Sequence, residues 1–187
     1  IDEPAVFITF NGMAYDEELV RRQFYWNLFE SYLTNTNGNG RLDILLMMNN
    51  VAAFSPDVLN IPLFNGGPGV SLKQADIAEA NGIEIGDAHD AIADCKLMIS
   101  LLEKINAKKP ELIDFFLSIS TKPGVQAAVQ QPGFLGLGEV FRREIFKYPV
   151  VPCGSKAPND LMFFDLSFDP DEVFEIDTQE IYSLVQK

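Results

Sequence analysis

The sequence has few of the residues on which several common kinds of site depend. It has one histidine, His89, and two cysteines, Cys95 and Cys153, which stand far apart without a CxxC spacing. These three residues do not supply the four ligands of an ordinary structural zinc site. A serine-hydrolase triad would have to use His89, and no GxSxG segment accompanies it. We therefore expect two reduced thiols in a cytoplasmic protein.

Long apolar runs and positive charge are also scarce. No run approaches the roughly 18–20 apolar residues that span a bilayer, so we expect no membrane anchor, and no signal-peptide pattern is present. The 14 Lys and Arg residues face 27 Asp and Glu residues, which gives a net charge of −13. A chain this acidic does not hold nucleic acid by general positive charge. Any such contact would need a local groove or bound metal ions.

Apolar residues make up 47% of the chain and alternate between strand-like and helix-like patterns. The run Ala5–Phe10 predicts a buried strand that needs neighbours in a sheet. Little sequence precedes it, which suggests a piece of a longer protein. Helices are expected over residues 16–33, 42–54, 71–80, from about 87 to 105, and 112–118. This order predicts an α/β fold.

The character of the sequence changes near Ser120. The segment Thr121–Pro132 is rich in turn residues, and Gly133–Gly138 is laced with glycine. Strands are expected at 161–168 and 173–176. Asp177 with Glu180 forms a capping box for a last helix over 178–186. We expect a domain boundary near residues 119–124, which divides the chain into 1–120 and 121–187.

Asp16 is the first candidate for chemistry. It follows the strand and the Asn11-Gly12 turn signal and opens a long helical pattern. A carboxylate at a strand end is held rigidly enough to bind a metal ion. An ordinary helix N-cap is the commoner explanation for a single Asp in this setting.

The second candidate is the segment Ala88–Asp94. His89 and Asp94 are five residues apart, which is about 140° around a regular helix. If His89 lies on the preceding loop, it can lean over a site that Asp94 enters from the first turns. A histidine there can act as general base for an attacking water. The alternative is a capping segment with small residues packed on the sheet, and spacing alone slightly favours it.

A two-metal site typically needs more carboxylates than Asp16 and Asp94 provide. The residues alone therefore support a half-site for metal-assisted hydrolysis. The aromatic run Phe24–Trp26 is a third candidate, because aromatic rings can stack on bases. At helical spacing near a buried strand, a place in the core is the favoured interpretation.

These motifs resemble those of a known nuclease family. Phe10–Leu19 is similar to the second motif of DEDDh exonucleases, and Ala80–Glu84 with Ala88–Asp94 is similar to the third. The closer resemblance is to the bacterial exodeoxyribonuclease I family. It extends over nearly the whole chain, through these further segments: Phe24–Leu28, Arg41–Leu45, Ser71–Lys73, Pro110–Asp114 and, more weakly, Leu161–Asp165 and Glu175–Tyr182.

The resemblance implies a ribonuclease H-like exonuclease domain, incomplete at its N-terminus, followed by the start of an SH3-like β-rich domain. It implies a monomeric DNA-repair enzyme that digests single-stranded DNA from the 3′ end with two Mg²⁺ ions, and single-stranded DNA-binding protein as a partner. Asp16 and Asp94 would be metal ligands and His89 the general base. Asn11, Arg41 and Lys73 would lie toward the DNA.

The first motif of the family, a D-x-E on the first strand, is absent from the sequence. We therefore expect the isolated chain to bind Mg²⁺ poorly and to be nearly inactive. A proofreading or RNA-trimming enzyme of the same superfamily is a close variant. The alternative of another class is a non-catalytic module that binds single-stranded DNA or the tail of single-stranded DNA-binding protein. An α/β domain with an accidental HxxxxD motif ranks last.

Overall fold

The computed structural model describes residues 3–86, 91–157 and 160–177. His89 and the helix expected over 178–186 lie outside the described residues. The chain divides into two compact units, Ile1–Gln131 with Gly138–Lys147, and Pro132–Leu137 with Tyr148–Lys187. The domain limits at 1–120 and 121–187 stay a prediction.

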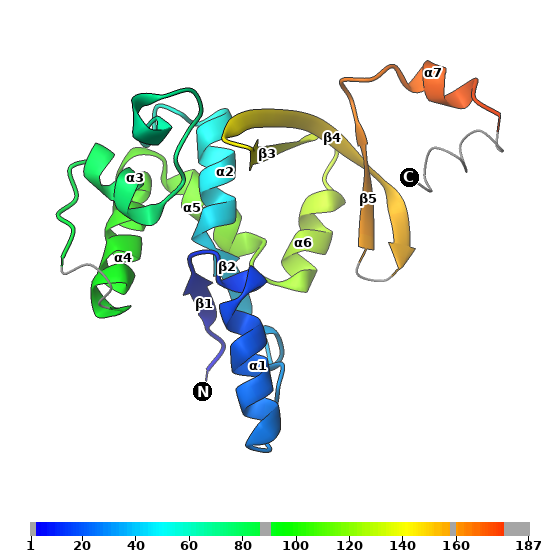
Figure 1. Ribbon diagram of the computed structural model, residues 1–187. Coiled ribbons are helices and arrows are strands. Elements are labelled where there is room, and N and C mark those ends of the chain that lie inside the picture. Colours follow the sequence, from blue (N-terminus) through cyan, green and yellow to red (C-terminus); the bar gives the residue numbers. More distant parts are fainter. Residues whose placement is uncertain (1–2, 87–90, 158–159, 178–187) are drawn as a thin grey trace. The chain divides into compact units, whose positions relative to one another are not determined.

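The first unit opens with a pair of parallel strands. β1 (Val6–Thr9) pairs with β2 (Gly40–Asp43), with Val6 opposite Gly40 and Thr9 opposite Asp43. Between them lie a short 3-10 helix, η1 (Gly12–Ala14), the helix α1 (Asp16–Trp26) and a second 3-10 turn, η2 (Leu33–Asn35) (Figure 1). Because parallel strands need a crossover, α1 and the segment after it form the connection. The strand expected at Ala5–Phe10 is confirmed.

The burial expected for this first strand is wrong in part, since Val6 and Ile8 are more than a third exposed. β2 itself was not expected, because Leu42 and Asp43 were assigned to the following helix. That helix, α2 (Ile44–Phe54), begins two residues later. The carboxylate of Asp43 accepts a hydrogen bond from the backbone N–H of Leu45, which is the geometry of an N-cap. The cap residue is extended and ends the strand.

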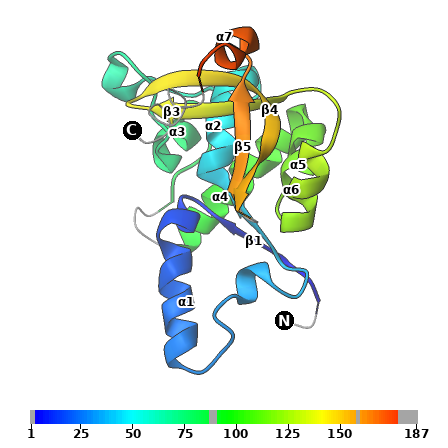
Figure 2. The same ribbon diagram turned by 90° about the vertical axis from the view of Figure 1, so that its right-hand side faces the viewer.

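The core of the first unit surrounds α2. Its inward residues Ile44, Met47, Met48 and Val51 are completely buried. The covering helices are α3 (Gln74–Ala80), α4 (Ala91–Lys108) and α5 (Pro110–Ser118). Their contributions to the same cluster are Ile77, Leu101, Ile105 and Phe116. Figure 2 shows α3, α4 and α5 beside α2. A helix that is apolar on most sides is stable only when surrounded in this way.

Helix α1 is shorter than the expected 16–33, because it ends at Trp26. Leu28 has a left-handed backbone, with φ of 61°, which breaks the helix. The core position expected for the aromatic run is wrong for two of its three members. Tyr25 is 71% exposed and Trp26 is 67% exposed, whereas Phe24 is half-buried and packs edge-on against Phe29.

The segment after Ser120 contains more regular structure than its composition predicted. The expected turn region holds α6 (Lys122–Val129). The hydroxyl oxygen of Thr121 accepts a hydrogen bond from the backbone N–H of Gly124, and a proline is tolerated in a first turn. The turn signals Pro123 and Gly124 therefore belong to a helix start.

A three-stranded sheet follows, in the order β3 (Leu135–Phe141), β4 (Glu144–Ala157) and β5 (Asp160–Asp165). The strand expected over 161–168 is confirmed as β5 but ends at Asp165, and it pairs antiparallel with β4. β3 lies where a glycine-laced segment was expected. A Cβ at Gly138 would stand 2.7 Å from the Ala53 Cβ, so this glycine serves the close approach of β3 to α2 rather than a turn.

The strand expected over 173–176 is wrong, because α7 (Pro170–Phe174) occupies its start. A carboxylate oxygen of Asp169 accepts a hydrogen bond from the backbone N–H of Asp171, which favours a helical turn there. Cys95 and Cys153 are free and exposed. Within the described ranges, no helix is long and apolar enough to span a bilayer.

Candidate active site

The turn between β1 and α1 is fixed by backbone requirements at two adjacent residues. Asn11 has a left-handed backbone, with φ of 62°, which asparagine tolerates better than most residues. A Cβ at Gly12 would lie 2.4 Å from the Cβ of Thr9, so only glycine fits without rearrangement. Asn11 itself is exposed. The Asn-Gly pair thus sets the path from the strand to the start of α1.

A buried carboxylate holds this turn in place. Asp43, only 4% exposed, accepts hydrogen bonds from the backbone N–H of Asn11 at 2.7 Å and of Met13 at 3.1 Å. It also accepts the bond from Leu45 at 3.0 Å. One carboxylate therefore joins the second-motif turn to the end of β2 and the start of α2. This role of Asp43 was not predicted, although an Asp directly before a long apolar helix is a recognisable N-cap signal.

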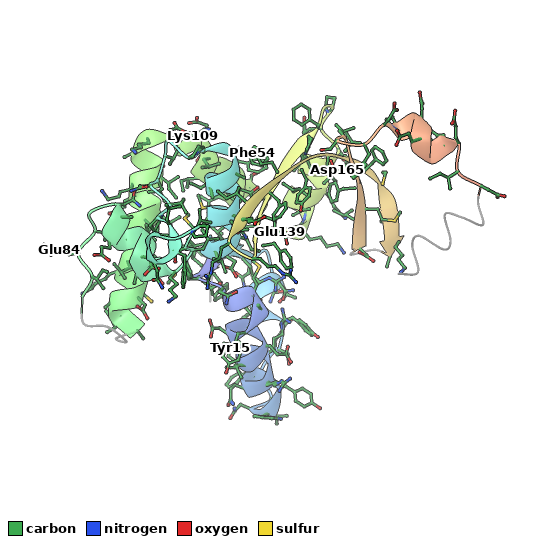
Figure 3. All side chains as sticks on the ribbon, turned by 45° about the horizontal axis from the view of Figure 1, so that its top comes forward. Tyr15, Phe54, Glu84, Lys109, Glu139 and Asp165 are labelled. Carbon is green, nitrogen blue, oxygen red and sulfur yellow. The ribbon has the colours of Figure 1, made fainter. Side chains whose placement is uncertain are left out.

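Asp16 is the first residue of α1 and is exposed to solvent. The N-cap is Tyr15, labelled in Figure 3, and its side chain makes no capping hydrogen bond. The interpretation of Asp16 as an ordinary N-cap is therefore wrong. Within the described part of the chain, the Asp16 carboxylate makes neither a hydrogen bond nor an ion pair. An exposed carboxylate without a protein partner is a hard oxygen donor that a cation can use.

The neighbouring residue, Glu17, is buried and paired with two arginines. Its Oε2 lies 3.3 Å from Nη2 of Arg21 on the same helix, and it also accepts a hydrogen bond from Nη1 of Arg41 on β2. The bond to Arg41 attaches α1 to the strand pair. Arg41, a predicted DNA contact, is therefore already engaged by a carboxylate, and a phosphate would have to compete with Glu17 for it.

The third-motif segment is built from the end of α3 and the start of α4. α3 ends at Ala80, Asn81 is its C-cap, and Gly82 has φ of 65°, which confirms the expected stop. Asn81 exchanges hydrogen bonds with the backbone of Asn60, of 2.9 Å from the Asn60 N–H and 2.8 Å to the Asn60 carbonyl. These bonds anchor the loop that leads toward α4.

Asp94 lies in the first turn of α4 and is exposed. Its backbone carbonyl accepts a hydrogen bond of 2.6 Å from the side-chain amide of Gln74, which ties α4 to the first residue of α3. Its carboxylate has no partner within the described ranges. His89 lies outside the described residues, so its position relative to Asp94 stays a prediction.

The remaining predicted residue, Lys73, is exposed and directly precedes α3. Its Nζ lies 5.9 Å from the centre of the Phe64 ring. The structure thus gathers two local groups. Asn11, Asp16 and Arg41 lie in or beside the β1–α1 turn. Lys73 directly precedes Gln74, and the backbone carbonyl of Asp94 accepts the hydrogen bond from Gln74.

Metal-binding capacity within the described residues is limited. Residues 3–86, 91–157 and 160–177 contain no group of three or more His, Cys, Asp and Glu side chains able to hold a metal ion. Asp16 and Asp94 offer hard oxygen donors, which suit Mg²⁺, but two monodentate carboxylates leave most of its six coordination positions to other ligands. A cavity of about 320 Å³ lies between the third-motif loop and α4, lined by Glu84, Ile85, Gly86, Ala93, Lys96, Leu97 and Ser100.

Comparison with known proteins gives consistent matches of sequence and fold. No protein-family model matches the chain. Exodeoxyribonuclease I of Buchnera aphidicola from Acyrthosiphon pisum is 34% identical over 116 residues, which are 62% of this chain and 28% of that protein. Exodeoxyribonuclease I of Escherichia coli is 30% identical over 125 residues, 66% of this chain and 26% of that protein.

Solved structures extend the match to most of the chain. Exonuclease I of Escherichia coli with a dT13 oligonucleotide aligns with a TM-score of 0.72 and 26% identity, over 92% of this chain and 39% of that one. Exonuclease I of Methylocaldum szegediense aligns with a TM-score of 0.74 and 26% identity, over 92% of this chain and 38% of that one.

The expected α/β exonuclease fold is thereby confirmed. The resemblance to exodeoxyribonuclease I is confirmed as well, because the curated homologues bear that name. The chain spans about a quarter of the length of the curated relatives it matches.

Proposed function

We propose that this chain carries part of the active site of a 3′–5′ exonuclease that hydrolyses single-stranded DNA to mononucleotides. One observation carries the proposal. Two carboxylates, Asp16 and Asp94, each lie in the first turn of a helix and have no partner in the described structure, in a chain that matches exodeoxyribonuclease I in both sequence and fold. Free carboxylates at fixed positions are what a metal-dependent nuclease requires.

The proposed roles follow the motifs. Asp16 and Asp94 would hold divalent metal, two Mg²⁺ ions in the complete enzyme, which would supply charge stabilisation at the scissile phosphate. His89 accepts the proton of the attacking water. Asn11, Arg41 and Lys73 orient the DNA strand. One of the similar structures is a zinc-bound form of an Escherichia coli ExoI–ssDNA complex. The experiment therefore compares several metal ions.

We further propose that the isolated chain has little activity. Two carboxylates are fewer than a two-metal site normally uses, and the described residues add no third ligand beside them. This observation also favours the second candidate function, a module that binds without hydrolysis. Its ligand would be single-stranded DNA or the tail of single-stranded DNA-binding protein. An ExoI/SSB-Ct complex is among the structures that share this fold.

A digestion assay on the purified chain tests both proposals. A 5′-labelled single-stranded oligonucleotide is incubated with the chain and Mg²⁺, Mn²⁺ or Zn²⁺, and binding is measured in parallel by fluorescence anisotropy. We expect measurable binding with almost no digestion. Strong digestion that Asp94→Ala abolishes would refute the predicted inactivity and support the nuclease. Absence of binding under every condition would count against both functions.

A further inference from the structure

The turn between β3 and β4 has an unusual backbone. Its two residues, Arg142 and Arg143, have φ of 50° and 72°, so both lie in the left-handed region. Two-residue hairpin turns of this kind favour Asn and Gly, because a side chain with a Cβ is strained there. Here two adjacent arginines adopt this strained conformation. Such strain persists where the surrounding structure fixes it, and it gathers at functional sites.

The surrounding structure does fix this turn, through the loop at residues 63–70. The carbonyl oxygen of Arg143 accepts a hydrogen bond of 2.8 Å from the backbone N–H of Val70. A Cβ at Gly69 would lie 2.6 Å from the Cβ of Arg143, so glycine permits the contact. Figure 3 labels Glu139 on β3, shortly before the turn. The hairpin is also fastened to α2, since Val140 N–H donates to the Asn49 side chain at 3.1 Å.

The cationic groups are held over aromatic rings. The Cζ of Arg143 lies 3.4 Å from the centre of the Phe64 ring, and Nζ of Lys73 lies 5.9 Å from the same ring. The Cζ of Arg142 lies 5.2 Å from the centre of the Phe141 ring. Stacking on a ring orients a planar guanidinium and leaves its N–H groups free at the edge. We call Lys73, Arg142 and Arg143 with Phe64 the hairpin patch.

The cations of this patch differ from the other arginines of the chain. Arg21, Arg22 and Arg41 are each paired with a glutamate. Arg142, Arg143 and Lys73 are exposed, and none forms an ion pair within the described ranges. The hairpin 139–147 holds three cationic and two anionic side chains, whereas the chain as a whole carries −13. Unpaired cations gathered in an acidic protein favour an anionic ligand.

We propose that the hairpin patch binds the phosphate backbone of the single-stranded DNA that approaches the active site. The inference rests on the proposed function and adds Arg142 and Arg143 to its DNA-binding residues. Continuity with the site favours DNA over an acidic peptide. Lys73 directly precedes Gln74, whose side chain binds the backbone of Asp94. A strand bound on the patch would thus run toward a proposed metal ligand, and guanidinium groups suit phosphate.

Binding measured as a function of salt tests the proposal. The probe is a fluorescein-labelled oligothymidine, in EDTA so that no hydrolysis occurs, with the wild-type chain, Arg142→Gln/Arg143→Gln, and Lys104→Gln as control. Lys104 is an exposed cation on α4 with no ion pair in the described part. The slope of log K against log salt is negative. Its magnitude should decrease by about 1.4 in the double variant, which is about 0.7 for each lost phosphate contact. The control should keep the wild-type slope.

Four outcomes would overturn the proposal. If the double variant has the wild-type slope and affinity, the patch does not bind the DNA, and the proposed function is unaffected. A lower affinity with an unchanged slope assigns the arginines a structural role, and Arg143→Lys, which keeps the charge, serves as the check on folding. The same variants are also tested with an acidic peptide. If the double variant loses binding to the peptide but keeps binding to DNA, the patch is a protein contact. If the wild-type chain does not bind oligothymidine, the proposed function is contradicted as well.

Discussion

The buried carboxylate of Asp43 accepts a hydrogen bond of 2.7 Å from the backbone N–H of Asn11, although 32 residues separate the two in sequence. The bond joins the end of one strand of the parallel pair to the turn that follows the other. Asp16 enters α1 five residues beyond Asn11. The position of a proposed metal ligand therefore depends on a side chain that the motif itself does not contain.

Asp43→Ala should lower the free energy of unfolding by about 2–4 kcal/mol, because it removes a helix cap and leaves three partly buried N–H groups without their acceptor. Urea unfolding followed by circular dichroism measures the change. Asp114→Ala, at an exposed site on α5, is the matched control and should have almost no effect. Equal losses in the two variants would show that the Asp43 network does not stabilise the fold.

Gly12→Ala should destabilise the chain by about 1–3 kcal/mol, because the new methyl group would meet Thr9 and force the turn to shift. Gly67→Ala is the control, since its Cβ would have one contact, 3.4 Å from the carbonyl oxygen of Phe64, and its φ is −93°. Thermal unfolding of both variants compares them. A Gly12→Ala protein as stable as the control would contradict the close approach of Gly12 and Thr9.

Glu17→Gln should cost about 1–3 kcal/mol, because two arginines lose a buried charged partner. Glu18→Gln is a matched control on the same helix. Glu18 is half exposed and pairs with Arg22 at the surface, so its loss should cost less than about 0.5 kcal/mol. The ranking of the two variants in urea unfolding is the result to compare, and a reversed ranking would contradict the anchoring role of Glu17.

Several elements could be predicted from local patterns. The first strand, the stop of α3 at Asn81-Gly82 and the proline start of α5 each depend on neighbouring residues, and each is found. β2 could not be predicted in this way. Its Leu42 continues the apolar pattern of α2, and the strand exists because β1 lies beside it. Pairing between distant segments leaves little trace in local periodicity.

The site was predictable only in part, for a similar reason. Asp16 and Asp94 were found by motif. The engagement of Arg41 by Glu17 and the three bonds of Asp43 come from tertiary contacts. The glycines of β3 were taken for loop residues, whereas Gly138 allows β3 to approach Ala53 of α2. The exposure of Tyr25 and Trp26 could not be predicted either, because the sequence around an aromatic residue in a helix does not show whether it is exposed.

The most direct test of the central claim is a chimera in which residues 1–120 replace the matching segment of Escherichia coli exodeoxyribonuclease I. With Mg²⁺, the chimera should digest 5′-labelled single-stranded DNA from its 3′ end. Asp16→Asn and Asp94→Asn should each lower the rate by about 100-fold or more, since metal and charge stabilisation are lost. A folded chimera that binds the DNA but does not cut it, or one that cuts equally well without Asp94, would contradict the account.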